Sequence, residues 1–324
     1  MMNEHIYRIV VPTPFPVGNV NMYLIKGDSL TLIDAGVKTE EAWRSFQQQL
    51  RQIGYAPSDI DQVVITHHHP DHVGLLDYLP DTIPVIGHQK ADRWLRQDET
   101  FFQQHQRFFE QFLLECGVDR SFLAELPNLR GSLRYACHRP LTATVKEGDL
   151  LPGLPHWKVI ETPGHAQSHV VFYRETDGAM IGGDHLLLHI SPNPLMEPPF
   201  PGETERPKPL VQYNASLLKM RDYDISFVMT GHGEDVTDVS ELIEKRLRKQ
   251  RERAEQVLDM LKQGPHTVFE VCQKLFPTVY QQEFILTMSE TIGQLDYLEE
   301  NGAVRKTKVN DYYIYEAMEG SICG

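Results

Sequence analysis

The stretch "VVITHHHPDHVG", residues 63–74, places four histidines and an aspartate within six positions, directly after an apolar run. A buried core histidine or a solvated loop explains one or two such residues, but not His67, His69, Asp71 and His72 together. Histidine and carboxylate ligands without thiolate suit zinc, and also iron or manganese. In an extended loop His67 and His69 can turn to one ion, while Asp71 and His72, at the start of the next helix, can reach a second. The sequence therefore predicts a metal site where a buried strand ends.

Three further candidate ligands lie downstream, each at the end of an expected strand and within a glycine-bearing turn. They are His165 in "TPGHAQSH", Asp184 in "IGGDH" and His232 in "MTGHGE". Alone, each such turn is more often structural, but together with the cluster they predict a dinuclear site.

Other polar residues near these motifs have supporting roles in this interpretation, because metal ligands need hydrogen-bond partners of their own. His68 should point away from the ions, and Asp34 in "LIDAG" should hold the metal loop by hydrogen bonding. His169 is either a contact for substrate or a proton, or a polar residue at a strand end. His185 and His189 can line the surroundings of Asp184.

The first 85 residues alternate between strand and helix patterns, which predicts an α/β layered core. A hairpin is expected around Gly27, a helix over 40–54, strands over 61–66 and 83–88, and a helix over 73–80. Later strands are expected in "WKVIETPG", "HVVFYRE", "GAMIGGD" and "ISFVMTGHGE", and a helix over 209–224.

Two segments look like additions to this core. Residues 93–117, within an insert of about 89–130, read as one helix. Its apolar and aromatic residues recur roughly three or four positions apart: Trp94, Phe101, His105, Phe108, Phe112 and Leu113. This face either packs on the core or forms a lid or acyl pocket. Residues 191–209 hold seven prolines, a composition that forbids a regular helix or central strand. We expect the three phenylalanines to wall one side of an apolar substrate cleft, with "NPLMEPPF" closing the other.

The composition changes near residue 238. Three helical stretches and a two-stranded hairpin turning at Asn310-Asp311 follow, which predicts a winged-helix-like unit. The expected domains are therefore a catalytic domain over 1–238 and a winged-helix-like domain over 239–324.

The ordered motifs "THHHPDH", "TPGHAQSH", "GGDH" and "GHG", with the early "NMYLI…LTLIDAG", resemble the metallo-β-lactamase superfamily over residues 6 to about 235. The resemblance implies an α/β fold, the αββα metallo-β-lactamase-like sandwich. It also implies His67, His69 and His165 on one ion, Asp71, His72 and His232 on the other, and Asp184 bridging both. Two such cations share a water and lower its pKa, giving hydroxide that attacks the substrate. Asp71 would orient that hydroxide or carry a proton.

Charge and cysteine content limit the partners and the cellular location that we expect for the chain. The 31 basic and 45 acidic residues give a net charge of −14, which argues against a general nucleic-acid partner. The N-terminal stretch lacks the pattern of a secretory signal, and no apolar stretch is long enough for a membrane span. The four cysteines, Cys116, Cys137, Cys272 and Cys323, are scattered and suggest reduced thiols in the cytoplasm.

Three functions compete. A hydrolase of a small ester, thioester or lactone resembles the hydroxyacylglutathione hydrolase branch, and agrees with the acidic chain and the aromatic insert. A single-strand endoribonuclease or other phosphodiesterase is the alternative, because a branch of the superfamily combines this domain with a similar tail. "EKRLRKQRER" supplies six basic residues in ten, although its glutamates weaken the positive electrostatic field of this stretch. A non-catalytic binding protein is the third. We expect a small-molecule substrate, and for the tail a packing or homodimerisation role.

Overall fold

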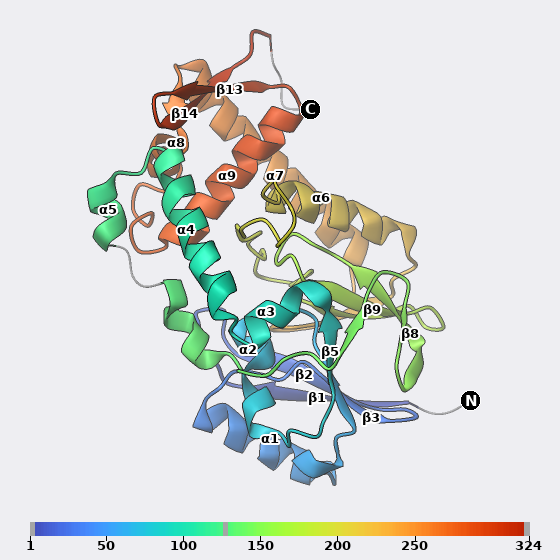
Figure 1. Cartoon of the computed structure of the whole chain (residues 1–324). Coiled ribbons are helices and arrows are strands. Elements are labelled where there is room, and N and C mark those ends of the chain that lie inside the picture. Colours follow the sequence, from blue (N-terminus) through green and yellow to red (C-terminus); the bar gives the residue numbers. More distant parts are fainter. Residues whose placement is uncertain (1–3, 126–128, 321–324) are drawn as a thin grey trace. The chain divides into compact units, whose positions relative to one another are not determined.

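The structure is a computed structural model that describes residues 4–125 and 129–320 (Figure 1). Its contacts divide the chain into two compact units. Unit 1 comprises Met1–Glu99, Asn128–Pro192 and Lys219–Val239, and unit 2 comprises Thr100–Pro127, Asn193–Leu218 and Ser240–Gly324. Contacts thus group the helical insert and the proline-rich loop with the C-terminal residues. The domain boundary at residue 238 stays a prediction.

Two mixed sheets form the centre of unit 1. The first has six strands in the order β1-β2-β3-β4-β5-β6, antiparallel from β1 to β3 and parallel from β3 to β6. Its strands are β1 (His5–Val11), β2 (Val20–Lys26), β3 (Leu30–Ile33), β4 (Gln62–Val64), β5 (Val85–His88) and β6 (Ala143–Val145). The predicted hairpin around Gly27 is confirmed as β2 and β3.

The second sheet has five strands in the order β11-β10-β9-β8-β7, with only β11 and β10 parallel. They are β7 (Leu150–Leu151), β8 (Leu154–Glu161), β9 (Val170–Arg174), β10 (Ala179–Gly183) and β11 (Phe227–Thr230). All four strands predicted for this part of the chain are present.

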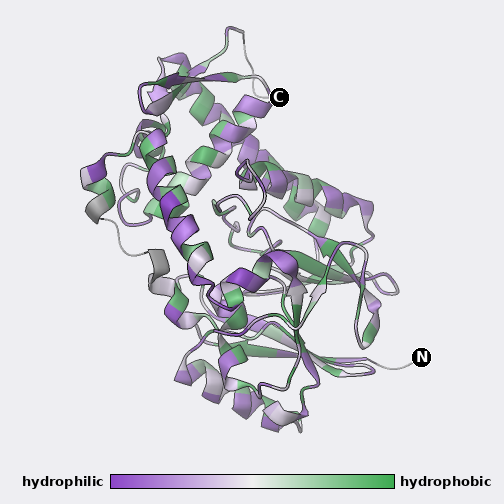
Figure 2. Ribbon diagram, viewed as in Figure 1, coloured by the Kyte–Doolittle hydropathy of each residue, from purple (hydrophilic) through white to green (hydrophobic). Residues whose placement is uncertain are grey.

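Strand periodicity explains how the layers pack. Neighbouring residues of a strand face opposite sides of the sheet, and Leu32 packs in the apolar cluster that includes Phe46 of helix α1 (Glu40–Gln52). The next residue, Ile33, packs in a separate cluster with Trp157 and Phe172 of the second sheet. Strands of both sheets are largely hydrophobic, whereas α1 alternates between hydrophobic and hydrophilic residues (Figure 2). The predicted αββα fold class is confirmed.

Two of the predicted helices differ in the structure. The helix expected over 73–80 is instead the end of α2 (Pro70–Val73) followed by a 3₁₀ helix over Gly74–Tyr78. The N–H groups of Gly74 and Leu75 donate to the carbonyls of Gly36 and Ala35, at 2.7 Å each, which diverts the chain from a longer α-helix.

The single helix expected over 93–117 is broken into α3 (Asp92–Leu95) and α4 (Glu99–Glu115). Gln97, between them, has a φ of 49°, a left-handed conformation that cannot continue a right-handed helix. Its amide donates to the carbonyl of Cys137 at 3.0 Å, so a tertiary contact holds the break.

Unit 2 is mainly helical. Besides α4 it contains α5 (Arg120–Glu125), most of α6 (Pro209–Lys219) and α7 (Val239–Lys262), α8 (Val268–Leu275) and α9 (Phe284–Glu300). A three-stranded sheet has the order β12-β14-β13, formed by β12 (His266–Thr267), β14 (Tyr312–Ala317) and β13 (Val304–Val309). The hairpin turns at Asn310-Asp311 as predicted, with Asn310 at a φ of 54°.

Within the described residues, no helix is long and apolar enough to cross a membrane. Cys116, Cys137 and Cys272 are free and buried. The fourth cysteine of the prediction, Cys323, lies outside the described residues.

Candidate metal centre

The first group of candidate ligands comprises His67, His69 and His165, whose ligand atoms all lie within 4.8 Å of one another. His67 and His69 follow β4, and His165 follows β8, so each sits where a buried strand has just ended. His67 Nε2 and His69 Nδ1 are 3.0 Å apart. A single ion can therefore be reached by all three rings.

The second group comprises Asp71, His72 and His232, again with ligand atoms within 4.8 Å. Asp71 and His72 lie in the short helix α2, and His232 follows β11. His232 Nε2 is 3.3 Å from Asp71 Oδ2. This is the second of the two sets that the superfamily resemblance implies.

Asp184, directly after β10, lies between the two groups. Its Oδ1 is 3.4 Å from His72 Nε2, and its Oδ2 is 3.5 Å from His165 Nε2 and 3.6 Å from His232 Nε2. One carboxylate thus faces histidines of both groups. This position suits a ligand shared by two ions.

Backbone hydrogen bonds between the two sheets bring these strand ends together. Val170 N–H donates to Thr66 O at 2.9 Å, and Asn21 N–H donates to Gly231 O at 2.7 Å. Gly231 also permits close approach, since a Cβ there would lie 2.2 Å from Asp184 Oδ1. Gly231 of the motif "MTGHGE" is therefore needed for space around the ligands.

The hydrogen bonding of the ligands fits bound cations. His232 Nδ1 donates to the carbonyl of Asn19 at 2.7 Å, and His72 Nδ1 lies 2.8 Å from Asp34 Oδ2. With Nδ1 engaged in this way, the Nε2 atom of each ring faces the Asp184 carboxylate. Among the described residues, His72 Nε2, His232 Nε2 and Asp184 Oδ1 are buried without a hydrogen-bond partner. A cation between these buried atoms would supply the missing partner for each of them.

The electrostatic environment differs from one candidate ligand to another. Burial, and then the neighbouring His72 and His69, hold the pKa of His67 well below its usual value, so this ring is a neutral donor. Burial alone would raise the pKa of Asp184, but His232 and His72 lower it well below its usual value. Burial alone would lower the pKa of His72 and of His232, but Asp184 raises both above their usual value. A bound cation would take the place of the proton on these two rings, because histidine ligates metals in its neutral form.

Asp34 supports the cluster as predicted. Its Oδ1 accepts from Thr66 N–H at 2.7 Å, and its Oδ2 orients His72. His68 also behaves as predicted: its ring stacks on Trp94 at 4.4 Å, and its Nδ1 lies 2.8 Å from Ser168 Oγ. Within the described residues, His68 belongs to none of the candidate metal groups.

His169 is a supporting residue. Its Nδ1 lies 2.7 Å from Thr162 Oγ1, and its Nε2 accepts from the backbone N–H of Asp184 at 3.1 Å. Both ring nitrogens are therefore used inside the protein, where they fix the start of the Asp184 turn. His185 is buried, with its ring 6.2 Å from that of His169, whereas His189 is exposed and lies 3.7 Å from Glu234.

Sequence reasoning missed the residues that hold the ligand-bearing loops. Asn21 donates to the carbonyls of Thr230 and Gly233, at 3.0 and 2.9 Å, and Tyr23 donates to Thr230 at 2.7 Å. Both belong to β2, far from His232 in sequence. The polar Asn21 in an otherwise apolar strand was the signal available.

The comparisons with known proteins agree with this geometry. Residues 15–232 match the profile of the Metallo-beta-lactamase superfamily, and the chain belongs to this superfamily. Its class of activity is that of a metallo-hydrolase, with His/Asp clusters typical of a dinuclear centre of this superfamily. The chain is 48% identical over 304 residues to "Probable metallo-hydrolase YqjP" of Bacillus subtilis (strain 168), covering 94% of this chain and 95% of that protein.

Two solved structures are similar over nearly the whole chain. The metallo-beta-lactamase family protein TTHA1429 from Thermus thermophilus has a TM-score of 0.80 and 28% identity, covering 97% of this chain and 98% of that one. A beta-lactamase domain protein from Burkholderia ambifaria has a TM-score of 0.76 and 22% identity, covering 97% and 92%. At 22% identity, the similarity to the Burkholderia ambifaria protein shows a shared fold and nothing about function.

Proposed function

We propose that the chain is a dinuclear hydrolase of small esters, thioesters or lactones. The observation that carries the proposal is the position of Asp184 between two groups of three ligands. His67, His69 and His165 would hold one divalent ion, and Asp71, His72 and His232 the other, most suitably zinc. Bound there, the ions supply a water of lowered pKa and polarise the scissile carbonyl.

The chain's own residues position this chemistry. Asp34 holds His72 in one orientation, and the Asn19 carbonyl does the same for His232. His169 fixes the backbone at Asp184. His72, His232 and Asp184 are thus held before substrate arrives, and little reorganisation of these ligands remains for the reaction.

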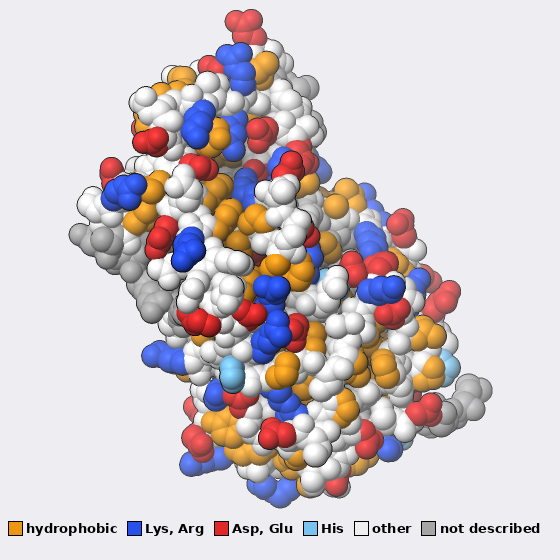
Figure 3. Space-filling view, in the orientation of Figure 1, with side chains coloured by type: hydrophobic (Ala, Val, Ile, Leu, Met, Phe, Trp, Pro, Cys, Tyr) orange, Lys and Arg blue, Asp and Glu red, His pale blue; other side chains and the backbone are white. Residues whose placement is uncertain are grey.

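Two observations favour a neutral acyl compound over a polyanion. The side chains that support the ligands are histidine, aspartate, threonine and asparagine, and Trp94 adds an apolar surface against His68 beside His69. Acidic and basic side chains are interspersed on the face shown in Figure 3, and the whole chain has a net charge of −14. A nucleic-acid track depends on a concentration of lysine and arginine.

Metal content and a substrate panel test the proposal. After reconstitution with zinc, iron or manganese, elemental analysis should give two ions per chain. Among thioesters, lactones, phosphodiesters and short RNA, the acyl compounds should be hydrolysed with the highest kcat/KM. One ion or none would contradict the dinuclear centre. Preferential cleavage of RNA would show that the substrate is a phosphodiester and not an acyl compound.

For the C-terminal residues we propose a winged-helix-like unit with a packing or homodimerisation role. Its support is the order helix, short strand, helix, helix and hairpin from α7 to β14, with a three-stranded sheet. A concentration-dependent mass in solution would support dimerisation. Tight RNA binding that weakens steeply with salt would contradict this role and indicate that the unit binds nucleic acid.

A further inference from the structure

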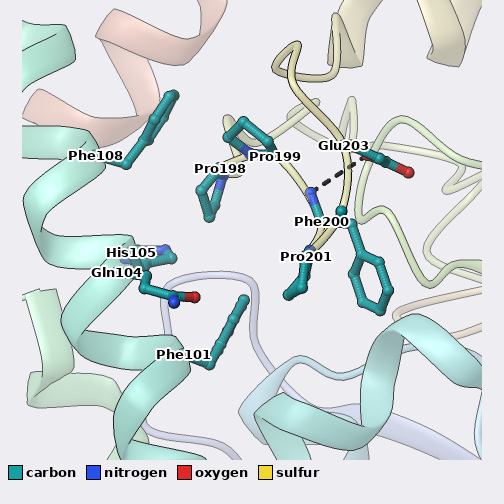
Figure 4. Close-up of a pocket in the computed structure, with 10 residues that line it drawn as sticks. Phe101, Gln104, His105, Phe108, Pro198, Pro199, Phe200, Pro201 and Glu203 are labelled. Carbon is teal, nitrogen blue, oxygen red and sulfur yellow. Dashed lines mark hydrogen bonds between the residues drawn. The ribbon is translucent and has the colours of Figure 1, made fainter.

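Unit 2 contains a cavity of about 330 Å³ between helix α4 and the proline-rich loop (Figure 4). Ten residues line it: Phe101, Gln104, His105, Phe108, Pro198, Pro199, Phe200, Pro201, Gly202 and Glu203. Two walls of different origin therefore face each other, one helical and one made of loop. Phe101 and Phe108 are two of the three aromatic residues expected in a cleft. Phe112, the third, does not line the cavity but stacks on Phe108 at 5.4 Å.

The helical wall results from the spacing of side chains on α4. Residues 101, 104, 105 and 108 recur three or four positions apart, which places them on one face. Phe109 and Leu113 belong instead to the apolar core of unit 2. The helix thus uses one face for folding and presents aromatic rings of another face to the cavity.

The loop wall is held in place at both ends by helix α9. The backbone N–H of Met196 donates to Ser289 Oγ at 3.1 Å. Arg206 forms an ion pair with both carboxylate oxygens of Asp296, which is 1% exposed, and its guanidinium lies 5.0 Å above the ring of Phe112. Prolines between these anchors restrict the backbone and lack N–H groups. The wall is therefore rigid and apolar before any ligand binds.

The size and charge of the cavity define what it can hold. Its volume is at the lower end of ligand pockets, roughly 300–1,000 Å³. A cavity of about 150 Å³ accommodates one benzene ring, so this one has room for two fused rings. The lining carries one carboxylate, Glu203 of the loop, together with the amide of Gln104 and the imidazole of His105 on α4, and no lysine or arginine. The carboxylate disfavours an anion, and the carboxylate and the amide oxygen can each accept a hydrogen bond.

We propose that this cavity is a binding site for a neutral, fused two-ring aromatic compound with an N–H donor. The faces of Phe101 and Phe108 pack on one side of the rings, and Pro198, Pro199 and Pro201 on the other. Glu203 or Gln104 accepts the ligand N–H at the rim. Every residue that lines the cavity belongs to unit 2, whereas the candidate metal ligands belong to unit 1.

Calorimetric titration of the full-length, metal-loaded protein with indole tests the proposal, with 2-naphthalenesulfonate as the anionic comparison. Indole should bind with a Kd on the order of 1 mM or below, as expected for so small a ligand, and the sulfonate at least about ten-fold more weakly. Gln104→Trp places a large ring in the mouth of the cavity from an exposed position of α4. It should weaken indole binding at least about ten-fold.

The matched control is Gln106→Trp, the same substitution on the same helix at an exposed residue that does not line the cavity. It should bind indole like the unmodified protein. A second variant, Glu203→Lys, changes an exposed residue and should reverse the preference towards the sulfonate. No indole binding, equal Kd values in Gln104→Trp and Gln106→Trp, or an unchanged preference in Glu203→Lys would overturn the proposal.

Discussion

In unit 1 the candidate metal centre is made of buried polar side chains from separate strand ends, whereas in unit 2 the cavity is made of aromatic and proline rings. The buried polar atoms of the metal centre need partners, and Asp34, His169 and Asn19 supply three of them. The cavity depends mainly on the packing of its apolar walls, and the ion pair Arg206–Asp296 anchors its loop. Substitutions in unit 1 should therefore affect metal binding and activity, and substitutions in unit 2 should affect stability or binding of the aromatic ligand.

The largest effect is expected for Asp184→Ala. Losing a carboxylate that faces both ligand groups removes several kcal/mol of stabilisation, so kcat/KM should fall by more than about 10³-fold. Elemental analysis should show fewer than two ions per chain. Asp177→Ala, the same change at an exposed turn preceding the same strand, is the control and should keep both ions. Full activity of Asp184→Ala would remove the bridging role.

The next largest effect is expected for Arg206→Met in unit 2. It leaves the carboxylate of Asp296 buried and unpaired, so the free energy of unfolding should fall by about 3–5 kcal/mol. The double variant Arg206→Met/Asp296→Leu should recover much of this loss. Urea unfolding measures both, and elemental analysis should find the metal content unchanged.

Arg248→Met, in an exposed ion pair with Glu252, is the control for Arg206→Met. It should change the free energy of unfolding by less than about 1 kcal/mol. If the two variants have equal stability, or if Arg206→Met loses metal, the contrast between the two units is wrong.

A smaller effect is expected for Asp34→Asn, which tests the support of the metal centre. Asparagine tolerates the left-handed backbone at this position, where φ is 61°. The change should weaken metal affinity and kcat/KM by about 10–100-fold, because His72 loses its charged partner. Metal titration and steady-state kinetics measure it, with the exposed Asp28→Asn as control. An affinity equal to that of Asp28→Asn would show that Asp34 does not orient His72.

The smallest effect is expected at the C-terminal hairpin. Asn310→Ala places a Cβ-bearing residue with no local hydrogen-bonding group at a φ of 54°, and should cost about 1 kcal/mol of unfolding free energy. Asn310→Gly should be neutral, because glycine adopts this conformation freely. Neither variant should change the metal content. Equal stabilities for the alanine and glycine variants would show that the turn is not strained.

Much of the metal centre could be predicted because its ligands follow strands whose apolar runs are easy to recognise. His67, His69, Asp71 and His72 are neighbours in sequence, and the strand ends before His165, Asp184 and His232 carry glycine turns. Four of the five strands in the second sheet were predictable for the same reason, although β8 begins at Leu154, three residues before the predicted segment. The helix break at Gln97 was not, because a contact with the carbonyl of Cys137, 40 positions away, stabilises a conformation that local propensity disfavours.

By itself the sequence determined the α/β layered core, the seven candidate ligands and the order of the helices and the hairpin in the C-terminal residues, because hydrophobic periodicity and residue chemistry are local properties. The αββα arrangement was implied by the resemblance of the motifs to the metallo-β-lactamase superfamily. Only the tertiary structure decided which residues support the ligands. Asn21 reaches Thr230 across 209 positions, and His169 reaches the backbone of Asp184. It also decided that the loop of 193–208 packs with α4 and α9 in one unit, through Met196 and Arg206. Such pairings depend on long-range packing, and a hydrogen-bond donor in a sequence does not identify its acceptor.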